Sequence, residues 1–93
     1  NNGGHGMIYH GERLQFGGKF RSSIFAKRLR IRELAKAMGA ASFLVERPGE
    51  LGAALEKALR LPGPCVIEAA TDLHEVPPMG ARVLALQRAL VAA

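Results

Sequence analysis

The sequence predicts an α/β fold, as the C-terminal part of a doubly wound domain with a parallel sheet. Apolar residues at helical spacing alternate with two short apolar runs, and Gly and Pro residues separate these segments. Two parallel strands leave open edges that further strands must cover. We therefore expect residues 1–93 to be a C-terminal fragment of one domain, incomplete at its N-terminal side.

The first half of the chain predicts two helices and a loop. Residues 6–16 are compatible with a short helix that Gly11 weakens. Residues 17–23 combine Gly, Ser and charge without periodicity, and we expect a mobile flap there. Ile31, Leu34, Ala35 and Met38 then repeat at helical spacing, and Gly39 is a typical helix stop.

The second half predicts strand, helix, strand and helix. Residues 41–46 are a short apolar run, interpreted as a strand, and Pro48 stands at a plausible helix start. The helix that follows has an apolar stripe and ends before Pro62. Residues 65–70 are almost continuously apolar, which is typical of a parallel strand covered on both faces. A loop through Pro77 and Pro78 leads to a last helix over residues 81–91. The apolar stripe of the middle helix consists of Leu51, Ala54, Leu55, Ala58 and Leu59.

Composition indicates a small protein domain of a reducing compartment. The single Cys65 has no disulfide partner, and no stretch has the roughly 18 apolar residues of a membrane span. We expect a cytoplasmic location and no membrane partner.

Positive charge is concentrated in the first half, where residues 1–47 hold nine Lys and Arg against three Asp and Glu. Such a cluster can neutralise nucleic-acid phosphates, so a small basic nucleic-acid-binding module is the alternative function. The segment has no recognised nucleic-acid motif and few aromatic residues, and a solvated loop and helix face explain it better. The cluster consists of Lys19, Arg21, Lys27, Arg28, Arg30, Arg32 and Lys36.

The first residues, Asn1-Asn2-Gly3-Gly4, carry the most chemistry. They place amide oxygens and bare backbone carbonyls at one point, where no side chain blocks a ligand. Mg²⁺ prefers oxygen ligands and takes only some of them from protein. Asn and Gly are also ordinary turn residues, so the motif alone does not decide between a turn and a metal site.

The order of motifs resembles the C-terminal, diphosphate-binding domain of thiamine-diphosphate-dependent enzymes of the acetolactate synthase and benzoylformate decarboxylase type. The similar pieces are the Asn-Asn pair with Gly behind it, the Gly6-Met7 helix start, the segment 33–40, the helix from Glu50, and Gly63-Pro64 before a strand that contains an acid. The resemblance extends to about Thr71. It implies an enzyme that uses thiamine diphosphate and Mg²⁺ to decarboxylate or ligate 2-keto acids.

The resemblance also implies site residues. Asn2 would bind Mg²⁺ through its side chain and Gly4 through its carbonyl, and His5, Gly6 and Met7 would complete the cofactor-binding residues. His5 is a candidate for proton handling beside the substrate, although a solvent-facing loop histidine is the simpler interpretation. The sequence identifies no catalytic residue.

Two departures limit the resemblance. The Gly-Asp-Gly half of the metal motif and the glutamate that activates the cofactor are both absent. We therefore expect this chain alone to be inactive, with the remainder of its own polypeptide and a second copy, in a homodimer or homotetramer, as partners. Tyr9-His10-Gly11-Glu12 replaces a stretch that contains Trp in biosynthetic acetolactate synthases, which leaves the substrate open. A non-catalytic interaction domain is a third possibility.

Four other residues are interpreted as structural. His10 and His74 are expected to face solvent, and Cys65 to be a small buried hydrophobe. Glu68 interrupts an apolar strand, so we expect it to be buried against a partner such as a nearby Arg.

Overall fold

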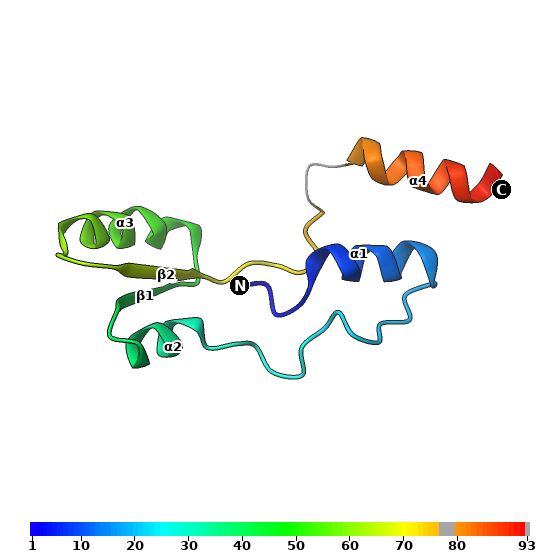
Figure 1. Cartoon of the computed structure of the whole chain (residues 1–93). Helices are drawn as coiled ribbons and strands as arrows, with labels where there is room; N and C mark the ends of the chain where they lie inside the picture. The colour runs from blue at the N-terminus through cyan, green and yellow to red at the C-terminus, as the bar shows by residue number, and fades with distance from the viewer. Residues whose placement is uncertain (77–79, 93) are drawn as a thin grey trace. The chain divides into compact units, whose positions relative to one another are not determined.

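The computed structural model describes residues 1–76 and 80–92 (Figure 1). The chain divides into two compact units. The sheet unit contains residues 1–3 and 26–72, and the helix unit contains residues 4–25 and the described residues from 73 onward. The predicted loop through Pro77 and Pro78 lies outside the described residues.

The sheet unit is a three-layer α/β structure, as predicted. Strands β1 (Ala41–Val45) and β2 (Cys65–Ala69) pair in parallel, with Ala41 opposite Cys65 and Val45 opposite Ala69. The 3₁₀ helix η1 (Pro48–Glu50) and helix α3 (Leu51–Arg60) connect them. Helices α2 (Ile31–Ala37) and α3 each contact both strands and cover opposite faces of the sheet (Figure 1).

The predicted elements of this unit are confirmed, with one difference. The first turn of the predicted middle helix is the 3₁₀ helix η1, and α3 begins only at Leu51. Pro48 is the first residue of η1, where its missing N–H costs nothing. Gly39 follows α2 with φ of +84°, a conformation that favours glycine at a helix end.

Glu68 fixes α2 to the sheet. Its side chain is buried, and one carboxylate oxygen accepts a hydrogen bond of 2.6 Å from the Arg32 backbone N–H. The Ser42 hydroxyl of β1 donates to the Arg32 carbonyl oxygen at 3.0 Å. Because Arg30 offers no side-chain cap to α2, Glu68 satisfies a free N–H group of the first turn.

The partner of Glu68 is therefore an arginine, as expected, but it binds through its backbone and not through its side chain. Arg32 provides its backbone N–H, whereas its guanidinium forms an ion pair of 3.2 Å with Glu33. Sequence reasoning favours a guanidinium because a buried carboxylate needs a positive or donating partner. A helix N-terminus meets the same need.

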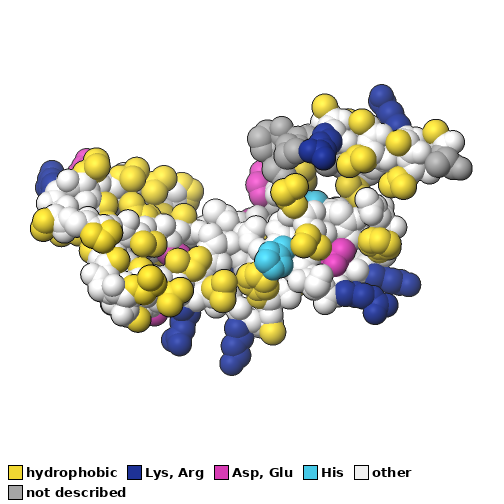
Figure 2. Space-filling view, viewed as in Figure 1, with side chains coloured by type: hydrophobic (Ala, Val, Ile, Leu, Met, Phe, Trp, Pro, Cys, Tyr) yellow, Lys and Arg dark blue, Asp and Glu magenta, His cyan; other side chains and the backbone are white. Residues whose placement is uncertain are grey.

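Small residues of the two helices face the sheet, and several large ones face outward. Ala35 of α2 and Ala54 of α3 are buried, whereas Leu59 is 85% exposed and Met38 is 79% exposed. Figure 2 shows hydrophobic side chains on the outer surface over α3. The predicted stripe of α3 is thus only partly covered, because two strands offer little surface to a helix. Strand β2 is likewise half-buried, including Cys65, rather than fully covered as predicted.

The helix unit consists of α1 (Gly6–Gln15), α4 (Gly80–Ala92) and the loops beside them. Both helices agree with the predicted ones within one or two residues. Tyr9 is its buried centre, at 5% exposure, and its ring stacks on Phe20 with centroids 4.6 Å apart. In the described ranges, no helix has the length and apolar character needed to cross a membrane.

We predict that Glu68→Ala destabilises α2 in particular, because it leaves the partly buried Arg32 N–H without its acceptor. The loss should be about 1–3 kcal/mol. Amide hydrogen exchange over residues 32–38 measures it. Glu56→Ala, at an exposed position of α3, is the matched control and should leave that exchange unchanged. Equal protection of α2 in the two variants would contradict this role.

Candidate functional site

Asn1 continues the sheet beyond β2. Its backbone nitrogen donates to the Ala69 carbonyl oxygen at 2.8 Å, and the Thr71 N–H donates to the Asn1 carbonyl oxygen at 2.9 Å. These two bonds follow the hydrogen-bond pattern of parallel strands. They lie on one edge of β2, whereas β1 lies on the other edge, to which the Ala70 N–H donates at the Val45 carbonyl oxygen. The Asn-Asn-Gly segment therefore lies at the carboxyl end of β2, where open α/β sheets bind their ligands.

The Asn1 side chain builds the turn. Its Nδ2 atom donates to the Leu29 carbonyl oxygen at 2.7 Å, and its Oδ1 atom accepts a hydrogen bond of 3.3 Å from the Gly3 N–H. Gly3 has φ of +76°, which L side chains rarely adopt. The first Asn of the pair is therefore a structural residue. The sequence offers only one signal for this role, which is the preference of Asn for local turns.

Gly4 starts the helix unit at a point of very close packing. It forms an antiparallel bridge with Ile24, and the His5 N–H donates to the Ser23 carbonyl oxygen at 2.8 Å. A Cβ atom at Gly4 would lie 2.2 Å from that same carbonyl oxygen and 3.1 Å from Leu73. No residue with a side chain fits there without movement of the backbone.

Ser23 is held from the other side by α1. It is completely buried, and its hydroxyl donates to Glu12 Oε2 at 2.6 Å. This hydrogen bond is the main reason that the pKa of Glu12 lies below its ordinary value of 4.5, with further lowering by the backbone of Arg21 and Ser22. Sequence reasoning placed Ser23 in a mobile flap and assigned Glu12 no role.

The predicted flap, residues 17–23, is therefore packed at its C-terminal end. Ser23 is buried, and Phe20 stacks on Tyr9. The Lys19 N–H also donates to the Phe16 carbonyl oxygen at 3.2 Å. Gly17 and Gly18 both have positive φ. Ser23 is held by its hydrogen bond in this structure, and the motion of the segment stays a prediction.

His5, Gly6 and Met7 lead from this point into α1. His5 is exposed, and its ring meets the Phe25 ring edge to face at 4.9 Å. Gly6 is the first residue of α1, and Met7 is 76% exposed, so Met7 does not belong to the core of this chain. Met7 also lines a mostly apolar pocket of about 440 Å³ within the helix unit, together with Leu14 of α1 and Leu86 and Leu90 of α4.

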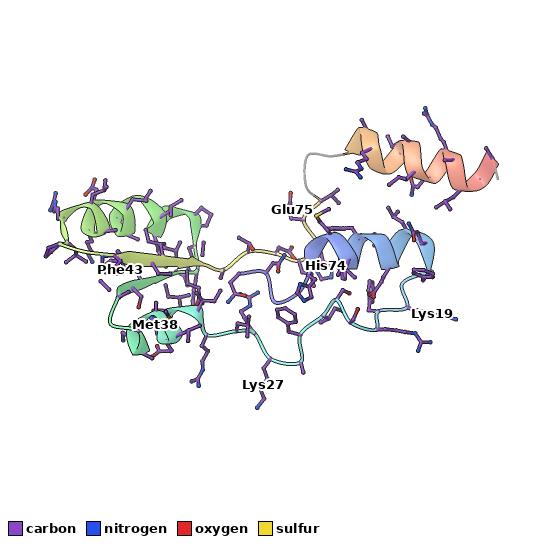
Figure 3. The ribbon with its side chains drawn as sticks, in the orientation of Figure 1. Lys19, Lys27, Met38, Phe43, His74 and Glu75 are labelled. Carbon is purple, nitrogen blue, oxygen red and sulfur yellow. The ribbon has the colours of Figure 1, made fainter. Side chains whose placement is uncertain are left out.

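The other two histidines also have partners in the helix unit. His10 Nε2 lies 3.1 Å from the Glu75 carbonyl oxygen, so this ring is engaged rather than simply solvated. His74 is exposed, as predicted, and its ring centroid lies 5.5 Å from that of Tyr9. Both His74 and Glu75 lie beside the start of α1 (Figure 3). Over residues 1–76 and 80–92, no three His, Cys, Asp or Glu side chains gather where they could hold a metal ion.

The basic residues are distributed over both units. Lys19 and Arg21 belong to the helix unit, and the others belong to the sheet unit. Lys27 extends away from the backbone (Figure 3), whereas Arg28 donates to the Thr71 carbonyl oxygen at 3.3 Å. Arg32 pairs with Glu33. The cluster is thus partly engaged with the protein itself, which favours its structural interpretation.

Comparison with known protein families gives a match over most of the chain. Residues 1–69 match the model of the family described as thiamine pyrophosphate enzyme, C-terminal TPP binding domain. The match covers more than half of the 93 residues and includes the Asn1–Gly4 segment, α1, α2, α3 and both strands. No curated protein matches the chain.

We predict that Gly4→Ala destabilises the protein by about 1–3 kcal/mol, since the new Cβ atom displaces the Ser23 carbonyl. Gly11→Ala is the matched control, because nothing lies within 4 Å of the added atom and position 11 is inside α1. This control should stabilise by about 0.5–1 kcal/mol. Denaturant unfolding measures the stability of both variants. Equal effects of the two substitutions would contradict the close packing at Gly4.

We further predict that the stabilisation from Glu12 depends on pH. Its pKa is lowered in the folded state, so the carboxylate stabilises the fold above its ordinary pKa of 4.5. That contribution is lost as the pH falls through the lowered pKa. Unfolding of the wild type and of Ser23→Ala, measured at pH 7 and near pH 2, should show a stability difference that is greater at pH 7 than at low pH. A difference that grows on acidification would contradict this account.

Proposed function

We propose a function for this chain from one premise, namely that it belongs to the thiamine pyrophosphate enzymes, as part of their C-terminal TPP binding domain. It is thus part of a thiamine-diphosphate-dependent enzyme. The proposed reaction is the Mg²⁺-dependent decarboxylation or ligation of 2-keto acids, as in acetolactate synthase-like enzymes. The observation that carries this proposal is the Asn1–Gly4 segment, which the backbone of Asn1 attaches to the carboxyl end of β2.

The proposed metal ligands are the Asn2 side-chain oxygen and the Gly4 carbonyl oxygen. The chemistry of this donor set fits a hard cation, since both atoms are oxygens and Gly3 and Gly4 add no side chain. Asn1 does not compete for this role, because its amide is used within the turn. Two ligands are too few for Mg²⁺. A carboxylate from another segment of the polypeptide and the cofactor diphosphate would complete the coordination.

The proposed cofactor-binding residues are Asn2, Gly4, His5, Gly6 and Met7. Thiamine diphosphate supplies a nucleophilic carbon that adds to a keto group and accepts the electron pair released on decarboxylation. This chain would hold the diphosphate end, contact the cofactor or substrate with Met7, and offer the exposed His5 imidazole for proton transfer. The edge-to-face contact with Phe25 gives that imidazole a defined orientation.

The proposed protein partners are the remainder of the same polypeptide and a second copy, in a homodimer or homotetramer. Large apolar side chains that lie outward on α3 and at the C-terminal end of α2 support such partners. Leu59 and Met38 are the most exposed of them. The chain alone would be inactive, because the Asn1–Gly4 segment has no carboxylate of its own. The unpaired Cys65 supports a cytoplasmic setting.

We predict that Asn2→Ala, in the full-length protein, weakens Mg²⁺ and thiamine diphosphate binding together by roughly 10-fold or more, because the metal joins protein and diphosphate. Asn2→Asp is the matched control, since it keeps an oxygen ligand and should retain metal-dependent binding. Titration calorimetry measures both affinities. An Asn2→Ala variant with the affinity of the wild type would refute the ligand assignment.

A further inference from the structure

An arginine lies against the proposed diphosphate turn. Arg28 belongs to the same sheet unit as residues 1–3. Its Nε atom lies 3.6 Å, and its Nη2 atom 3.9 Å, from the position that a Cβ atom would occupy at Gly3. A side chain at Gly3 would thus be in ordinary van der Waals contact with the guanidinium, which places Arg28 beside the turn.

The position of this guanidinium is defined by the backbone around it. Arg28 Nη2 donates to the carbonyl oxygen of Thr71, and Thr71 in turn donates through its N–H to Asn1. The next residue, Leu29, accepts the Asn1 side-chain hydrogen bond of 2.7 Å. Arg28 and Asn1 are therefore held by the same residue, Thr71, through its carbonyl oxygen and its N–H respectively.

Among the residues that the structure describes, the Arg28 guanidinium donates to the Thr71 carbonyl oxygen alone. A guanidinium has five N–H donors in a planar fork that suits phosphate oxygens, and the contact with Thr71 uses the Nη2 group alone. The residue is exposed, so an incoming anion can reach it. The neutral ligands Asn2 and Gly4 add no charge, and Mg²⁺ together with a carboxylate ligand offsets only part of the charge of a diphosphate. A fixed cation beside the turn is what such a site still needs.

We propose that Arg28 binds the diphosphate of the cofactor by charge-assisted hydrogen bonds. This inference rests on the proposed function and adds a positively charged group to the neutral ligands of the turn. Two neighbours differ from Arg28 in ways that matter for a test. Lys27 extends away from the backbone (Figure 3), and the Arg32 guanidinium is paired with Glu33.

The test compares Arg28→Gln with the control Lys27→Gln in the full-length protein at saturating Mg²⁺. Titration calorimetry is performed with thiamine diphosphate and with thiamine, which lacks the phosphates. Arg28→Gln should weaken thiamine diphosphate binding by about 10-fold or more, the loss expected for a hydrogen bond to a charged group, and leave thiamine affinity unchanged. Lys27→Gln should change neither. Arg28→Lys should restore only part of the affinity, since an ammonium lacks the planar fork.

Unchanged diphosphate affinity in Arg28→Gln, or an equal loss for thiamine and thiamine diphosphate, would overturn the inference and leave the proposed function intact. A wild type that binds no thiamine diphosphate would overturn the proposed function as well. Should Arg28→Gln fail to fold, the wild type gives the answer through modification by phenylglyoxal. Thiamine diphosphate with Mg²⁺ should protect the peptide that contains Arg28, and equal modification with and without the cofactor would contradict the contact.

Discussion

The pairing of Asn1 with the free edge of β2 is the constraint on which the proposed site depends. Two backbone hydrogen bonds attach this residue to Ala69 and Thr71, and its amide then sets the conformation of the turn. A segment attached in this way cannot move independently of the sheet. The proposed metal ligand Asn2 is consequently presented at the carboxyl end of a parallel strand, the usual position of ligands in open α/β sheets.

Glycine is required at the two positions of the turn for different physical reasons. Gly3 is needed for its positive φ, and Gly4 for the close approach of the Ser23 carbonyl. Neither requirement involves a metal. Both nevertheless place residues without side chains where a diphosphate and its cation would bind. Ser23 links this packing to Glu12 on α1. The site is thus supported by residues that would touch neither metal nor cofactor.

The regular elements could be predicted from the sequence because their signals are local. The helical repeat before Gly39 and the apolar run from Cys65 each indicate one conformation. Contacts between distant residues gave no such signal. The partly buried hydrogen bond between Ser23 and Glu12 joins two residue types that are common at exposed positions. The pattern of a strand likewise does not show that Glu68 caps the N-terminus of a helix. Exposure of Leu59 could not be predicted either, because it depends on how much sheet lies beneath α3.

The most direct measurement is a crystal structure of the full-length protein with thiamine diphosphate and Mn²⁺ in place of Mg²⁺, in which anomalous scattering locates the metal. The account predicts one peak at the Asn1–Gly4 segment, within coordination distance of the Asn2 side-chain oxygen and the Gly4 carbonyl oxygen. A metal bound with the cofactor elsewhere in the protein, away from these two oxygens, would contradict it.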